Sequence, residues 1–212
     1  MMTTTRIFTL LLLLNLCNFA DGGKFNKKLS VGDAAPTWAD LEGTDGKKHA
    51  LADLKDKDVV VLFFICNSCV VAVDYEDRIL AFAKTHAAPD GKVAMVAVNV
   101  NTGKDDSLDK MKARAEKRKF PFAYLFDPSQ EIAKAYGAMY TPEFFVLDKA
   151  RKVVYMGAMD DKSPPRELQL FLSRDIFDKL DARAEGESVS LSKLVEYAWR
   201  QAHPFVAPKK SR

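Results

Sequence analysis

The feature that most constrains this chain is a continuous apolar run that ends in two cysteines. Residues 59–65 read VVVLFFI, and the tetrapeptide Cys-Asn-Ser-Cys follows at 66–69. β-branched and aromatic residues without polar alternation are typical of a strand that is buried on both faces of a sheet. The next segment, Val70–Lys84, mixes apolar and charged residues as an amphipathic helix does. The run therefore predicts a central parallel strand and then a helix, with the cysteine pair at their junction.

Strands and helices alternate through the rest of the chain. The turn signal Asp45-Gly46 separates two short edge strands, which we expect within Val31–Asp40 and at Lys48–Leu51. The further elements that the pattern predicts are strands at Val93–Val100 and Phe122–Phe126, helices at Leu108–Lys119 and Pro128–Tyr136, a hairpin of Glu143–Leu147 with Val153–Met156, and a helix from Ser163 that ends near Gly186. This order indicates an α/β sheet with mixed strand direction.

Composition excludes several classes of protein. The chain has 212 residues, 48% of them hydrophobic, and only 3 cysteines, which indicates one globular domain rather than a disordered, fibrous or disulfide-dense chain. A net charge of +3 is too balanced to attract nucleic acid by itself, so we interpret the basic run at 112–119 as the solvated face of a helix. A mean hydropathy of -0.17 excludes a protein with many membrane spans.

The first 22 residues have the features of a secretory signal peptide. Arg6 precedes a mostly apolar stretch, Ile7–Ala20, which is shorter than the ~20 apolar residues of a spanning helix. We expect cleavage after Ala20 or Gly22, with loss of Cys17, and export to the periplasm or the extracellular space; a retained membrane anchor is the weaker alternative. The predicted organisation is a signal peptide at 1–22, a linker at 23–30, one domain at 31–185, and a helical, basic extension at 186–212.

Cys66 and Cys69 have the spacing of a redox-active dithiol. With two residues between them in a first helical turn, their sulfurs can approach disulfide distance, and the helix N-terminus favours a thiolate. We expect Cys66 to be the more exposed residue and the nucleophile. Cys69 should lie deeper and resolve the mixed disulfide that Cys66 forms.

Three other interpretations of the pair remain open. A structural disulfide would close a loop of four residues, which stabilises a fold by only roughly 2 kcal/mol. A closed zinc site needs four ligands, and the histidines (His49, His86 and His203) have no ligand spacing from one another. Two inert core cysteines would suit a reducing cytosol better than an exported protein. Each explains the pair less well than dithiol chemistry does.

A second motif, Tyr140-Thr141-Pro142, directly precedes a predicted strand. A proline there is confined to an edge, a bulge or a cis peptide bond. Together with the cysteine pair, it makes the chain resemble the thioredoxin superfamily, in particular exported redoxin-domain proteins related to TlpA-like thiol–disulfide oxidoreductases and to the AhpC/TSA group. The residues that carry this resemblance are VGDAAPTWADLEGTDGKKHALADLKDKDVVVLFFICNSC at 31–69, VDYEDRI at 73–79, FDPSQEIAKAYGAMYTPEFFVLD at 126–148 and VVYMGAMDD at 153–161.

The resemblance implies a thioredoxin-like fold, with three α/β/α layers around a mixed sheet, an N-terminal β-hairpin and a C-terminal helical extension. It implies that Cys66 and Cys69 are catalytic, that their disulfide is the only redox group, and that no metal is needed. It also implies substrate contacts from four residues: Asn67, Ser68, Thr141 and a cis Pro142. The implied partners are protein thiols and disulfides and a separate electron donor, which we expect to be membrane-linked.

The sequence departs from the family pattern in ways that bear on function. Val70 stands where many relatives have proline, and the apolar strand holds no carboxylate, so the proton-transfer partner is unassigned; the nearest downstream acid is Asp74. A peroxidase site would need proline seven and threonine or serine three residues before its cysteine, but Val59 and Phe63 stand there relative to Cys66. We therefore favour a thiol–disulfide oxidoreductase that acts as a reductant, with a peroxiredoxin-like antioxidant peroxidase and a non-catalytic binding domain as alternatives.

Overall fold

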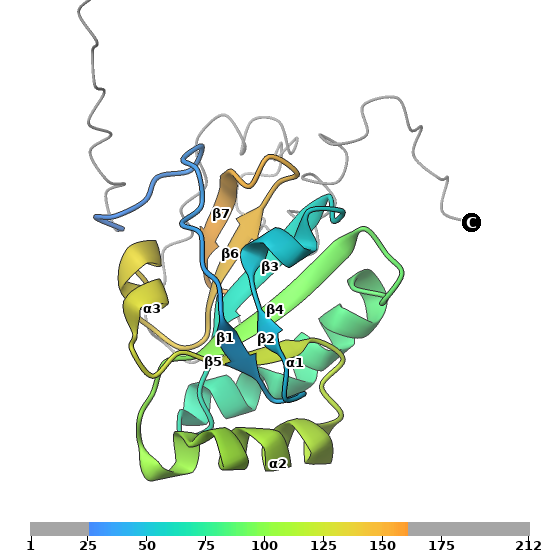
Figure 1. Ribbon diagram of the computed structural model, residues 1–212, viewed down its shortest axis with the longest axis vertical. Coiled ribbons are helices and arrows are strands. Elements are labelled where there is room, and N and C mark those ends of the chain that lie inside the picture. The colour runs from blue at the N-terminus through green and yellow to red at the C-terminus, as the bar shows by residue number, and fades with distance from the viewer. Residues whose placement is uncertain (1–25, 161–212) are drawn as a thin grey trace, which may run out of the picture.

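A seven-stranded mixed sheet forms the centre of the structure, a computed structural model that describes residues 26–160 (Figure 1). The strands lie in the order β2-β1-β5-β4-β3-β6-β7. Their bounds are β1 Leu41–Gly43, β2 Lys48–His49, β3 Val59–Phe64, β4 Val93–Asn99, β5 Ala123–Phe126, β6 Glu143–Leu147 and β7 Val153–Gly157. The helices are α1 Val70–His86, α2 Leu108–Arg118 and α3 Glu131–Tyr136, with 3-10 turns η1 at Leu51–Leu54 and η2 at Lys104–Asp106.

β3 is the central strand that the apolar run predicts. It pairs in parallel with β4 and antiparallel with β6, and every one of its residues is buried. β5 continues the parallel part of the sheet, whereas β1, β2, β6 and β7 pair antiparallel with their neighbours. The predicted mixed strand direction is therefore confirmed.

The two faces of β3 pack against different helices. Val59, Val61 and Phe63 share a core with side chains of α1 and α2. The residues between them along the strand share a second core with α3 and with the segment before β1. Figure 1 shows α1 and α2 on one side of the sheet and α3 on the other. Because each buried large apolar side chain contributes about 1.5–3 kcal/mol, this double-sided burial drives folding of the layered structure.

The first strand differs from its prediction in position and in pairing. Within Val31–Asp40 the structure has only an isolated bridge from Ala34 to Lys152, and the strand β1 follows at Leu41–Gly43. β1 is not an edge strand, because it pairs with β5 as well as with β2.

The amphipathic helix predicted at Val70–Lys84 is present as α1, which extends to His86. Its first turn exposes Val70 and Val73, whereas Ala72, Tyr75, Ile79, Phe82 and Ala83 are buried. Apolar periodicity could not reveal this, since the turn lies beside the cysteine pair at the end of the sheet rather than over it.

The described chain begins with residues that pack on the domain. Leu29 is buried, and Asn26 Nδ2 donates a hydrogen bond of 2.7 Å to the carbonyl of Tyr136, although both lie in the predicted linker. The predicted signal peptide, the helix from Ser163 and the C-terminal extension lie outside the described residues. Between residues 26 and 160, none of the helices has the length and apolar character that a membrane crossing requires.

Candidate active site

The sheet topology brings three separate segments to one edge. β3 and β4 run in parallel, with Phe64 opposite Val98, so the chain leaves both strands at the same end of the sheet. β6 runs antiparallel and begins there, with Glu143 opposite Phe64. The cysteine tetrapeptide after β3, the loop after β4 and the Thr-Pro motif before β6 therefore meet, although they are far apart in the sequence.

Both cysteines are free thiols in this structure, and their exposure reverses the prediction. Cys66 is only 5% exposed, whereas Cys69 is partly exposed. The reason is that α1 begins at Val70, with Cys69 at its N-cap, so Cys66 precedes the helix. Cys66 also directly follows Ile65, whose N–H still bonds to the carbonyl of Val98 as an extension of the sheet. The expectation that Cys66 is the more exposed residue, inside a helical turn, was wrong.

Thr141 contacts both sulfurs. Its hydroxyl oxygen lies 3.5 Å from Cys66 Sγ, and its carbonyl accepts a hydrogen bond of 3.3 Å from Cys69 Sγ. The next peptide bond, Thr141-Pro142, is cis, and Pro142 is buried. The structure thus brings four of the predicted site residues together at one place.

Asn67 and Ser68, the other two predicted site residues, have side chains that bond within the protein. Asn67 Nδ2 donates to the carbonyl of Asp105 at 2.9 Å, and Asn67 Oδ1 accepts from the hydroxyl of Tyr124 at 3.1 Å. Ser68 Oγ donates to Asp106 Oδ2 at 2.6 Å. The loop between the cysteines is therefore held from the side of β5 and η2.

Asp106 is the residue of this site that the sequence prediction missed. It is 1% exposed, and its Oδ1 accepts hydrogen bonds from the Asn67 N–H at 2.6 Å, the Ser68 N–H at 3.4 Å and Asn99 Nδ2 at 3.1 Å. Burial alone would raise the pKa of this carboxyl, but the hydrogen bonds, led by that of Ser68, lower it below its usual range. Polar residues that follow the second apolar strand were the available signal, because parallel neighbours end at the same edge.

The pKa of the Cys66 thiol is raised. Its burial is the main cause, and the nearby Cys69 thiol and Asp106 carboxylate act in the same direction. The hydrogen bonds from Thr141 and from the Cys69 N–H oppose this rise without cancelling it. Less Cys66 is therefore thiolate at neutral pH than in an ordinary exposed cysteine, contrary to the expected effect of a helix N-terminus.

Exposed apolar side chains adjoin the site residues along the chain, after Cys69 and before Thr141. Val70, at 72% exposed, and Val73 extend from α1, while Met139, at 69%, and Tyr140 extend from the loop before Thr141. We call these four residues the apolar rim. Single exposed apolar residues are common, but four of them beside a reactive pair indicate a contact surface.

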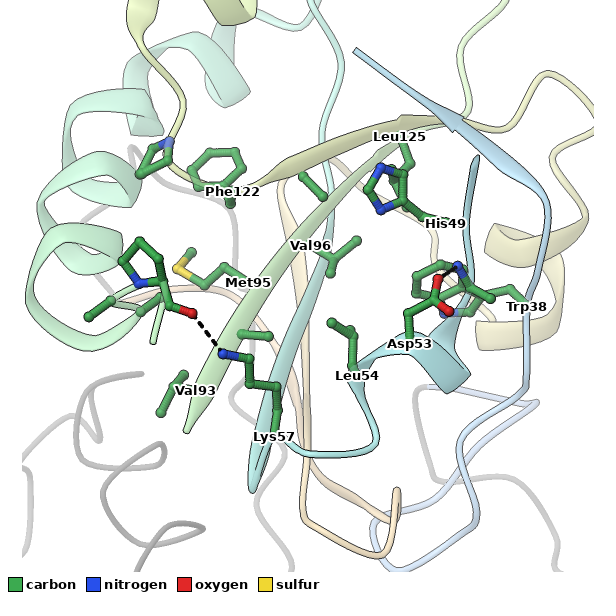
Figure 2. A pocket seen from close by; sticks show the side chains of 17 residues that line it. Trp38, His49, Asp53, Leu54, Lys57, Val93, Met95, Val96, Phe122 and Leu125 are labelled. Carbon is green, nitrogen blue, oxygen red and sulfur yellow. Dashed lines mark hydrogen bonds between the residues drawn. The ribbon is translucent and has the colours of Figure 1, made fainter. Parts of the chain in front are cut away.

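A hollow lies away from this site. Figure 2 shows its lining, which includes Trp38, His49 and Phe122 and has a volume of about 250 Å³. It opens where Val93–Met95 of β4 have no β5 partner, because pairing with β5 begins at Val96. No residue of the cysteine site lines it, so it has no direct part in thiol chemistry.

Within residues 26–160, no group of three or more His, Cys, Asp or Glu side chains could hold a metal ion.

A layered mixed sheet, a Cys-x-x-Cys pair before a helix and a cis proline beside the sulfurs define a thioredoxin-like thiol–disulfide oxidoreductase. The model of the AhpC/TSA family matches residues 31–156, and the chain belongs to that family. Both the fold class and the superfamily expected from the sequence are thus confirmed.

Relatives of known sequence or structure agree with this assignment. The thiol-disulfide oxidoreductase ResA of Bacillus thuringiensis subsp. konkukian is 30% identical over 156 residues, which cover 70% of this chain and 84% of the relative. An uncharacterized conserved protein from Geobacillus kaustophilus, known from its crystal structure, is 36% identical in sequence. The match covers 72% of this chain and 81% of that protein's chain, with a TM-score of 0.61. The crystal structure of the thioredoxin domain of a thiol-disulfide oxidoreductase from Bacteroides vulgatus shows the shared fold. The two sequences are 17% identical, and the match covers 74% of this chain and 99% of that domain, with a TM-score of 0.50.

Proposed function

We propose that this protein is an exported thiol–disulfide reductant of other proteins, with Cys66 as nucleophile and Cys69 as resolving residue. The observation that carries the proposal is the asymmetric contact of the two sulfurs with Thr141. Cys69 donates a hydrogen bond to the Thr141 carbonyl, whereas the Thr141 hydroxyl, 3.5 Å from Cys66 Sγ, and the Cys69 N–H can both donate to a Cys66 thiolate. A sulfur that receives donors is the one on which a thiolate is stabilised, which makes Cys66 the attacking group.

The reaction transfers two electrons in two steps. The Cys66 thiolate attacks one sulfur of a partner disulfide; that bond breaks, a mixed disulfide forms, and the partner's other sulfur leaves as a thiolate that takes a proton from solvent. Cys69 then loses its proton and attacks Cys66 Sγ, which forms the Cys66–Cys69 disulfide and releases the second partner thiol. A separate dithiol protein, which we propose to be membrane-linked, returns the two electrons.

The surroundings of the sulfurs favour a protein as the partner. The apolar rim offers a surface to a polypeptide segment that flanks a disulfide, and a peroxide molecule needs no such surface. The loop of Thr141 and Pro142 would align that segment beside Cys66. Asn67 and Ser68 would contribute chiefly by shaping the loop, since their side chains are bonded within the protein.

Trapping a mixed disulfide tests the roles of the two cysteines. We expect the Cys69→Ser variant to accumulate a stable mixed disulfide with insulin or another disulfide-bonded protein, because the resolving thiol is gone. The Cys66→Ser variant should trap nothing and should lose the dithiothreitol-driven insulin reduction of the native chain. Non-reducing gels and intact mass spectrometry measure both.

Each alternative has its own outcome in these assays. If the Cys66→Ser variant, rather than Cys69→Ser, trapped the mixed disulfide, Cys69 would be the nucleophile and Cys66 the resolving residue. Insulin reduction at the background rate in native chain and variants alike would instead indicate a non-catalytic binding domain. Consumption of hydrogen peroxide that depends on Cys66, without reduction of insulin, would indicate an antioxidant peroxidase.

A further inference from the structure

The loop between the cysteines directs its backbone donors away from the reactive sulfur. In Cys-x-x-Cys sites the N–H groups after the first cysteine are natural donors to its thiolate. Here the N–H groups of Asn67 and Ser68 point to Asp106 Oδ1 instead, at 2.6 and 3.4 Å. The Ser68 hydroxyl lies 2.6 Å from Asp106 Oδ2 and 4.0 Å from Cys66 Sγ, so its single proton serves the carboxylate.

Among residues 26–160, the basic side chain that hydrogen-bonds to this loop is Arg114, and its bond goes to the loop carbonyl rather than to the sulfur. Arg114 Nη1 reaches only the carbonyl of Asn67, at 3.3 Å, while its Nε bonds to Glu76 at 2.6 Å. Tyr124 is buried, with a pKa raised above its usual range, and stays a neutral phenol. On the other side, the Glu143 carboxylate accepts hydrogen bonds from the N–H groups of Met139 and Tyr140, and Cys69 Sγ donates to the Thr141 carbonyl.

We propose that Asp106 is a positioning residue of the dithiol, which fixes the Asn67-Ser68 loop by accepting three hydrogen bonds from it and so disfavours the thiolate form of Cys66. This inference deepens the proposed function, on which its biological meaning rests. A strong disulfide oxidant has a stabilised thiolate in its reduced form. Asp106 removes two donors from Cys66 and adds a negative charge beside it, which suits a reductant.

The Asp106→Asn variant separates the charge from the shape. Asparagine can still accept the Asn67 N–H, so the loop stays in place while the negative charge is lost. We expect the pKa of Cys66 to fall by about half a unit to one unit. The rate of attack on a small disulfide at pH 7 should rise by up to about threefold, because a larger thiolate fraction is partly offset by weaker nucleophilicity.

The measurement is the pH profile of iodoacetamide labelling, followed by mass spectrometry of the tryptic peptide that ends at Arg78. All variants are made in the full chain carrying Cys69→Ser, so that this peptide holds one thiol. Asp105→Asn is the matched control: Asp105 is the exposed neighbour, and only its main-chain carbonyl contacts the loop, so its pKa effect should be much smaller.

Labelling needs no protein partner, so its result stands even if insulin reduction fails. An unchanged or higher pKa of Cys66 in a folded Asp106→Asn variant would overturn the proposal. Slower attack at pH 7 would also overturn it, since that would make Asp106 a proton acceptor. An equal fall of the Cys66 pKa in Asp105→Asn would show that any nearby surface charge has this effect, and it would overturn the specific role of Asp106.

Discussion

At the scale of single residues, the reactivity of this site depends on which groups surround one buried sulfur. Burial of Cys66 raises its pKa, and the Thr141 hydroxyl at 3.5 Å is the side-chain contact that opposes the rise. Asp106 acts in the opposite sense to Thr141. The two neighbours therefore give substitutions with effects of opposite sign on the same measured quantity.

Thr141→Val should raise the pKa of Cys66 further, by about half a unit to one unit, because it removes one hydrogen bond to the sulfur but keeps the shape of the side chain. The Thr141 carbonyl, which accepts from Cys69, is unaffected. Since a higher pKa means less thiolate below it, labelling of Cys66 at pH 7 to 8 should slow and recover only at higher pH. A profile that moves to lower pH would contradict the assignment of this hydroxyl as a stabilising group.

At the scale of elements, a charged contact joins α1 to α2 beneath the cysteine loop. Glu76 of α1 is buried; it accepts a hydrogen bond of 2.6 Å from Arg114 Nε of α2 and forms an ion pair with Arg118 of α2, whose Nε lies 2.6 Å from Glu76 Oε2. The basic run at 112–119, which the sequence presents as a solvated face, thus supplies two arginines to an interface. Arg118 also contacts Asp77, which is exposed.

We expect Glu76→Gln to lower the free energy of unfolding by about 1–2 kcal/mol, because two arginines lose their carboxylate in a buried contact. The effect is smaller than that for a fully buried pair, since both guanidinium groups reach solvent. Urea denaturation followed by circular dichroism measures it.

Asp77→Asn is the matched control for this prediction. It removes the neighbouring carboxylate of the same helix, which is exposed and contacts only Arg118 among the ion pairs of the described residues. Exposed pairs contribute about 0–1 kcal/mol, so the variant should unfold close to the native midpoint. Equal losses for the two variants would show that Glu76 contributes only as a surface charge.

At the scale of the whole molecule, the described fold begins within a few residues of the predicted cleavage site. Asn26 bonds to Tyr136 beside α3, and Leu29 is in the core. Cleavage after Ala20 or Gly22 would leave both contacts in place.

We predict that the chain recovered from the exported fraction of an expressing cell lacks its first 20 or 22 residues, as intact mass spectrometry can determine. Its thermal unfolding should match that of a chain expressed from residue 23, because the bond of Asn26 to Tyr136 is present in both. Recovery of the full-length chain in the cytosolic fraction alone would refute export. Full-length chain that remains with membranes would support a retained anchor.

The sequence by itself determined the order and type of the elements and the cysteine pair at their junction. A strand buried on both faces must be apolar throughout, and turn residues such as Gly137, which ends α3 with a positive φ of 66°, mark where elements stop. Local patterns are visible in one sequence because they depend on neighbours along the chain. The order of strands in the sheet, with β1 between β2 and β5, depends on pairing between residues far apart along the chain, so local patterns do not reveal it.

Only the tertiary structure decided the surroundings of the sulfurs. Ser68 and Asp106 are 38 residues apart and meet because parallel β3 and β4 end at one edge of the sheet. The burial of Cys66 follows from the same packing, and it reverses the exposure that spacing alone suggested. The reactive pair can thus be recognised from the sequence alone. The pKa of its nucleophile, in contrast, depends on burial and on distant residues that folding brings into contact.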